Sequence, residues 1–153
     1  MNEIEFVVDQ LKRAYEGEAW HGPSLMEALS GVNATTAAAR PLPNAHNIWQ
    51  LVLHVSNWNE VFLKRMDGGV LQLSPEEDFP AVTDTSESAW KAALEKLKAS
   101  HKNLEKRISA ADPSFLERRV PGKDYNFRFM VHGIVQHEAY HAGQMSILKK
   151  PAK

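Results

Sequence analysis

Two histidines four residues apart are the first feature of this sequence that could support chemistry. His137 and His141 lie in an apolar stretch with a helical period. Side chains at this spacing share one face of a helix, with their Cβ atoms about 5–6 Å apart. Two imidazoles at that separation can bind one metal ion at about 2.0–2.1 Å. The spacing therefore predicts a pair of metal ligands.

The position of both histidines on their helix supports this prediction. The apolar stripe of residues 127–148 includes Met130, Ile134 and Met145, and it puts the histidines where a bundle core usually has leucine. Buried imidazole nitrogens need partners away from water, and a metal ion satisfies one nitrogen of each ring. Core histidines that are merely hydrogen-bonded are the alternative.

A third histidine lies in the apolar stripe of a second expected helix. His54 falls between Leu51 and Trp58. Taken alone, it could be a core residue or a ligand, but beside a two-histidine site it becomes the expected third ligand. Three histidines with an open fourth position are typical of a catalytic or substrate-binding metal site.

Glu138 lies inside the HExxH pattern of residues 137–141, which resembles the zinc-binding helix of metallopeptidases. Such peptidases usually take a third ligand downstream, and residues 142–153 contain no His, Asp or Glu. A third ligand from upstream disfavours the peptidase interpretation. Glu138 remains a candidate general base on metal-bound water; a solvated helix carboxylate or a hydrogen-bond partner within the site is the alternative.

Five further residues are candidates for a pocket around the metal. His101 continues the apolar seam of a third helix and is a reserve ligand, while His21 lies in a stiff Gly-Pro loop that could line a pocket mouth. His46 and His132 are expected to be peripheral, and the four tryptophans are expected in the core or the pocket wall. The candidate pocket residues are Trp20, His21, Trp58, His101 and Gln144.

The elements that must position these residues are helices. Apolar side chains recur with a helical period in four long stretches, and Asn47 with Gln50 and Ser24 with Glu27 are spaced as capping boxes. The expected helices cover residues 4–15, 47–66, 86–110 and 127–148, with shorter helical pieces at 24–31 and 33–39 and an acidic surface loop at 74–85. This pattern predicts one all-α domain, a four-helix bundle over residues 1–153. The connection over residues 17–46 is long enough for a crossover after the first helix.

Composition excludes several functional classes. The chain has 18 Lys and Arg against 19 Asp and Glu, without the basic stripe that a nucleic-acid-binding protein needs. It has no cysteine, which removes disulfides, thiolate ligands and a cysteine nucleophile and is consistent with a reducing compartment. No apolar run approaches the roughly 18 residues of a membrane span, and the N-terminus lacks a signal-peptide pattern. We therefore expect a cytoplasmic protein that binds neither membrane nor nucleic acid.

Three blocks of the sequence resemble the DinB/YfiT-like superfamily of metal-binding four-helix bundles. They are residues 20–29 (WHGPSLMEAL), 48–58 (IWQLVLHVSNW) and 137–144 (HEAYHAGQ), of which the last is the most specific. The resemblance implies an up-down-down-up bundle, a zinc or nickel site formed by His54, His137 and His141, and a homodimer. Activities known in that superfamily include transfer and isomerisation reactions that use low-molecular-weight thiols.

The sequence is therefore consistent with three functions. The first is a metal-dependent enzyme that acts on a small molecule by thiol-dependent S-transferase-like chemistry, with the thiol supplied by a cofactor. The second is a hydrolase that uses metal-bound water, with Glu138 as base. The third is a non-enzymatic metal-binding or stress-response protein that uses the bundle as an interaction surface.

Overall fold

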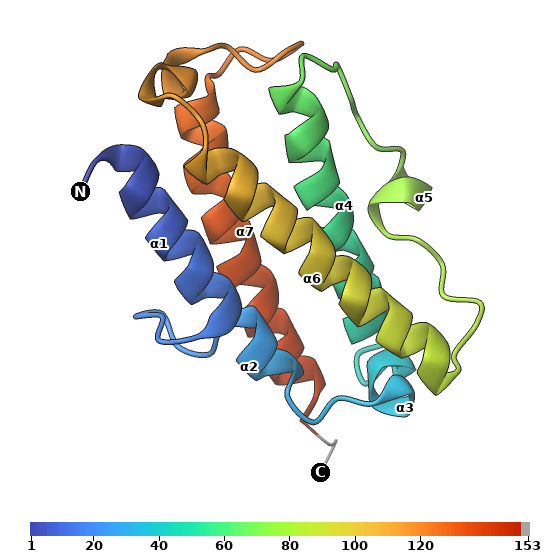
Figure 1. Cartoon of the computed structure of the whole chain (residues 1–153). Helices are drawn as coiled ribbons and strands as arrows, with labels where there is room; N and C mark the ends of the chain where they lie inside the picture. Colours follow the sequence, from blue (N-terminus) through green and yellow to red (C-terminus); the bar gives the residue numbers. More distant parts are fainter. Residues whose placement is uncertain (151–153) are drawn as a thin grey trace.

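The chain forms an all-helical bundle in the computed structural model, which describes residues 1–150. Figure 1 shows the long helices side by side and the short ones in the connections between them. The long helices are α1 (Glu3–Glu16), α4 (Ile48–Met66), α6 (Glu87–Ser109) and α7 (Phe127–Leu148). The short ones are α2 (Leu25–Leu29), α3 (Ala34–Ala38), α5 (Pro75–Asp78) and the 3-10 helix η1 (Pro113–Glu117). The prediction of an all-α fold is confirmed.

Side-chain caps determine where these helices begin. The Asn47 side chain accepts a hydrogen bond from the Gln50 amide, and the Gln50 side chain bonds back to the Asn47 amide. Ser24 and Glu27 form the same reciprocal pair at α2. Such caps satisfy amide groups that have no partner within the helix. Both predicted capping boxes are therefore present.

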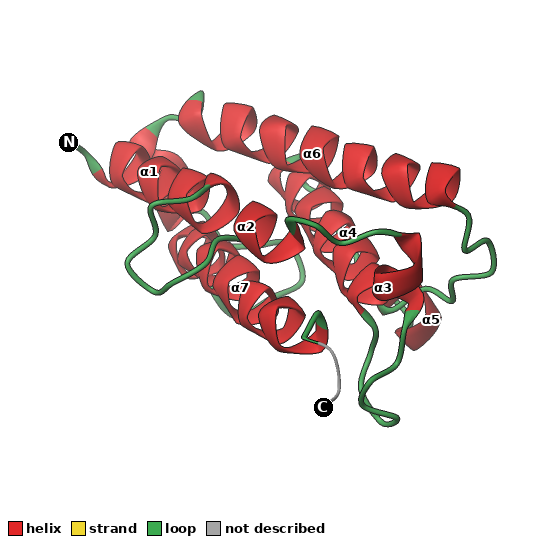
Figure 2. Cartoon of the chain, turned by 90° about the horizontal axis from the view of Figure 1, so that it is seen from below, coloured by secondary structure: helices red, strands yellow, loops and turns green. Residues whose placement is uncertain are grey.

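The four long helices pack in a ring in which α1 and α4 each contact both α6 and α7. In Figure 1, α4 and α6 run in one direction and α1 and α7 in the other. Viewed from below, α2 lies against α7, and α3 lies near the start of α4 (Figure 2). No helix within residues 1–150 is long and apolar enough to cross a membrane.

The segment that runs along the length of the bundle follows α4, not α1. The connection from α1 to α4 stays at one end and carries α2 and α3, whereas residues 67–86 return along the outside of α4 to the start of α6 (Figure 1). The sequence pattern predicts the long crossover after the first helix and a surface loop at residues 74–85. The structure instead has the short helix α5 there, capped by a reciprocal Ser74–Glu77 pair.

A polar layer divides the bundle core into two apolar clusters. In this layer Asn59 donates to the Ser100 hydroxyl at 3.2 Å, and His101 Nδ1 lies 3.0 Å from the Glu138 carboxylate. Polar side chains inside a bundle are costly unless they are hydrogen-bonded. The hydrogen bonds within this layer offset part of that cost. The histidines predicted to bind metal lie beside the layer.

Candidate metal centre

The structure brings His54, His137 and His141 together, although 83 residues separate the first from the second. His137 Nε2 lies 2.8 Å from His54 Nε2 and 3.1 Å from His141 Nε2. One nitrogen from each ring lies within 4.8 Å of the others. Three imidazole nitrogens so placed could hold one divalent metal ion.

The crossover segment orients His54. Its Nδ1 lies 3.0 Å from the Asp78 carbonyl oxygen and 2.9 Å from the Asp78 carboxylate. Trp58 Nε1 donates to the same carboxylate at 2.7 Å, and the Phe79 ring stacks on the His54 ring with centroids 4.1 Å apart. Because these oxygens can only accept, His54 carries its proton on Nδ1, which leaves the Nε2 lone pair facing the other histidines.

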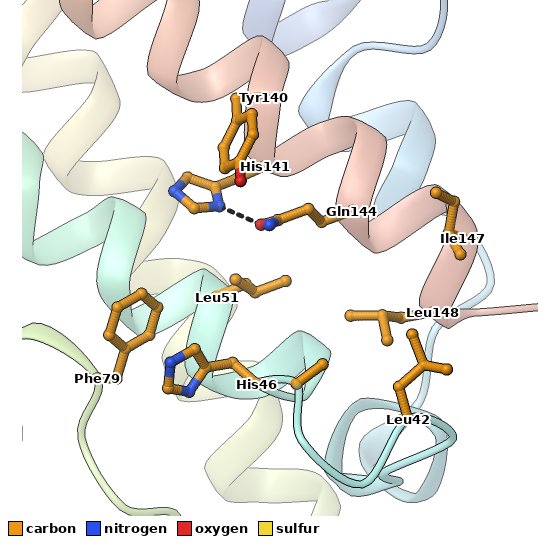
Figure 3. A pocket seen from close by; sticks show the side chains of 10 residues that line it. Leu42, His46, Leu51, Phe79, Tyr140, His141, Gln144, Ile147 and Leu148 are labelled. Atoms are coloured by element: carbon orange, nitrogen blue, oxygen red, sulfur yellow. Dashed lines mark hydrogen bonds between the residues drawn. The ribbon is translucent and has the colours of Figure 1, made fainter.

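Gln144 orients His141 in the same way. The His141 Nδ1 atom lies 2.6 Å from the Gln144 side-chain oxygen, one turn further along α7 (Figure 3). The His141 proton is therefore on Nδ1 as well, and its Nε2 lone pair faces His137. Ligand histidines in metalloproteins typically donate their second nitrogen to an oxygen in this way.

The proton count of the cluster fits a metal ion. Two Nε2 lone pairs, from His54 and His141, face the single Nε2 of His137. A proton on His137 Nε2 can be donated to only one of these two lone pairs, so the second lone pair is left without a hydrogen-bond donor. The Nδ1 of His137 is buried without a partner too. A cation between the three Nε2 atoms would satisfy all three lone pairs at once.

Electrostatics keeps these imidazoles neutral. Burial, together with the neighbouring His141 and His54, lowers the pKa of His137 to about 3. Burial also lowers the pKa of His141 to about 4 and shifts that of His54 downward. A histidine binds metal only through a neutral nitrogen, so the site is ready for a metal at neutral pH.

A cavity of about 380 Å³ opens onto all three histidines. Its wall is largely aromatic and apolar, formed by side chains that include Trp58, Phe129, Met130 and Ile134. A second cavity of about 400 Å³ lies on the other side of His141, between Leu42, Phe79 and Gln144 (Figure 3). A mostly apolar cavity with a few convergent polar groups is the usual form of a small-molecule site.

Comparison with protein families assigns most of the chain to one superfamily. The model of the DinB superfamily matches residues 19–145, which is most of the chain and includes all three histidines. The chain belongs to the DinB superfamily. No curated protein and no solved structure matches it.

Of the predicted pocket residues, the structure of this DinB-superfamily chain brings Trp58 and Gln144 to the three histidines. Trp58 lines the cavity and Gln144 bonds to His141. His101 is buried on the inner face of α6, as its spacing predicts, but it contacts Glu138 and not the three histidines. Trp20 and His21 lie on an exposed loop, with Trp20 fully exposed, because that loop leaves the bundle between α1 and α2.

Glu138 is fully buried, so the interpretation of it as a solvated carboxylate is wrong. It lies on the innermost face of α7, one turn after Ile134, while the half-buried His137 lies beside that face. Its carboxylate contacts His101 and lines neither cavity, and burial raises its pKa. A role for Glu138 as base remains a prediction from the sequence.

The site also contains Asp78, Phe79 and Arg65, which the sequence pattern does not predict. The Ser-Pro-Glu-Glu pattern at residues 74–77 is a capping-box signal that predicts α5. Nothing in the local sequence indicates that Asp78 would contact His54, because that contact depends on the path of the crossover. Arg65 follows His54 by three helical turns, which puts both on one face of α4.

Replacing Gln144 by alanine is expected to weaken metal binding by about 10–100-fold, since the hydrogen bond that orients His141 is lost. The affinity can be measured by zinc competition with a chelating dye. Gln136→Ala is the matched control, because Gln136 is exposed on the same helix. Equal affinities in the two variants would show that Gln144 does not position the ligand.

Proposed function

We propose that this protein is a metal-dependent enzyme that activates a low-molecular-weight thiol for transfer to a small electrophile. The observation that carries the proposal is the convergence of three neutral histidine nitrogens on the wall of an apolar cavity. Zinc and nickel are the metals we propose, because imidazole suits both. A divalent metal bound there would supply a Lewis acid that lowers the pKa of a bound thiol or water.

The sequence limits the source of a thiol, and the cavity wall disfavours hydrolysis that depends on a general base. The chain has no cysteine, so a thiol must enter the cavity from solution. Asp78 is the one carboxylate among the described residues that line the cavity, and it already accepts hydrogen bonds from His54 and Trp58. Hydrolysis that depends on a general base would need a free carboxylate next to the attacking water, whereas a metal-activated thiol attacks without such a base.

In this proposal the residues around the cavity have different roles. His54, His137 and His141 would hold the metal, while Asp78 and Gln144 fix the orientation of two of these rings. The cavity wall would surround the reacting sulfur with largely aromatic and apolar side chains. The sulfur forms a new bond to the electrophilic carbon as the leaving group departs with the electrons of the broken bond, and the thiol proton passes to solvent.

Conjugation of small thiols to monochlorobimane tests the proposal. Zinc- or nickel-loaded protein should accelerate formation of the fluorescent carbon–sulfur product, with release of chloride, over the same thiol and free metal. The acceleration should disappear after chelation and in His54→Ala. Metal-loaded protein that accelerates no member of a panel containing cysteine, glutathione and cysteamine would contradict thiol transfer.

Ester hydrolysis tests the alternative function, a metal-dependent hydrolase with Glu138 as base. Hydrolysis of p-nitrophenyl acetate by metal-loaded protein that falls in Glu138→Gln would favour the hydrolase. Thiol transfer that persists in Glu138→Gln would assign Glu138 no part in the reaction.

A further inference from the structure

Arg65 is a charged residue that is buried in the bundle. The residue is 2% exposed on α4. Its Nη2 donates to the Leu71 carbonyl at 2.8 Å, its Nη1 reaches the Tyr125 hydroxyl at 3.5 Å, and its Nε is buried without an acceptor. No Asp or Glu within residues 1–150 forms an ion pair with it. A guanidinium stays charged in proteins, and burying it without an anion is costly.

The guanidinium of Arg65 belongs to the same cavity as the three histidines. Arg65 and Tyr125 line that cavity together with His54 and His137. Arg65 lies three turns after His54 on one face of α4, and helical side chains tilt toward the N-terminus, so Arg65 leans back toward the histidines.

Trp58 lies between the guanidinium and the histidines. The Arg65 Cζ atom is 5.6 Å from the centroid of the Trp58 ring, and this ring is 6.1 Å from that of His137. A cation over an indole face is stabilised, but the contact does not neutralise it. The cavity therefore has a positive end at Arg65 and a metal-binding end at the histidines, with one indole between them.

We propose that the cavity takes a small molecule that carries a carboxylate at the Arg65 end and its reactive group at the histidine end. The planar fork of a guanidinium matches a carboxylate, and the Tyr125 hydroxyl beside it offers one more donor. The identity of the ligand's reactive group rests on the proposed function. The ligand's carboxylate is inferred from Arg65 alone.

A purely structural role accounts for Arg65 less well. Its bond to Leu71 holds the start of the crossover segment, but a neutral donor could make that bond without burying a charge. Replacing Arg65 by glutamine keeps a donor for the Leu71 carbonyl and removes the charge. Arg65→Gln therefore separates the two roles, and thermal unfolding checks that it folds.

Two thiols of equal length test the anionic end. Zinc-loaded protein should bind 6-mercaptohexanoate about tenfold or more tightly than 6-mercaptohexanol by calorimetry, the range of a hydrogen bond to a charged group. Arg65→Gln should lose this preference and keep its affinity for the alcohol. Arg107→Gln is the matched control, because Arg107 is an exposed arginine on α6 that pairs with Asp67.

Metal-free protein separates this inference from the proposed function. Arg65 needs no metal, so metal-free protein should also prefer hexanoate over hexanol, and this preference should disappear in Arg65→Gln. If this preference is observed but the metal-loaded protein conjugates no thiol, the anion site is supported and the proposed thiol transfer is wrong. Equal affinities for the paired ligands in the wild type, or a preference that survives in folded Arg65→Gln, would overturn the anion site whatever the protein catalyses.

Discussion

Replacing His137 and His141 together by alanine is expected to abolish metal binding. The change removes two of the three nitrogens that converge in the cluster and leaves His54 alone. Untagged protein incubated with zinc and freed of excess should contain close to one zinc per chain in the wild type and almost none in the variant. Elemental analysis measures this directly.

Thermal unfolding gives a second measure of the same prediction. A ligand that binds only the folded state at 100 times its Kd adds about 2.7 kcal/mol of stability, which raises Tm by roughly 5–10 °C for a chain of this size. We expect this rise on adding zinc to the wild type and none in the double variant.

His132→Ala is the control, because His132 lies on the same helix and pairs with Glu3 on the surface. It should keep both the metal and the thermal shift. Wild-type protein that binds neither zinc nor nickel would leave three core histidines with no role beyond packing. Zinc retained at full stoichiometry by the double variant would place the metal elsewhere in the chain.

The three histidines could be predicted because their signal is local. Positions 137 and 141 are one helical turn apart, and position 54 interrupts an apolar stripe. Residues at this spacing lie on one face of a helix whatever the tertiary fold is, so these faces can be predicted from the sequence alone. The starts of α2 and α4 could be predicted for the same reason, since their capping boxes are patterns of four residues.

The contacts around the histidines could not be predicted because they depend on tertiary packing. Asp78 meets His54 only because residues 67–86 return along the outside of α4. Glu138 is next to a histidine in the sequence but points into the polar layer toward His101, since neighbouring helical positions face about 100° apart. Trp20 is large and aromatic, yet its loop leaves it in solvent.

The folded state without metal is expected to lose stability as the pH falls below about 6.5. An unfolded histidine has a pKa near 6.5, whereas burial lowers the pKa of His137 to about 3 and that of His141 to about 4. Between about pH 4 and 6.5 the unfolded chain therefore binds protons that the folded chain does not. Stability rises with pH across this window, by about 1.4 kcal/mol per pH unit for each such proton.

Urea unfolding of metal-free protein at pH 5, 6 and 7 measures this dependence. His137→Ala with His141→Ala should show a shallower decline than the wild type, because the protons taken up on unfolding are removed. Glu138 titrates in the opposite sense, since burial raises its pKa, but it is present in both proteins and its effect cancels in the comparison. Parallel curves would mean that the two imidazoles are protonated in the folded state as easily as in the unfolded one. They would then not be the neutral, desolvated pair that a metal centre requires.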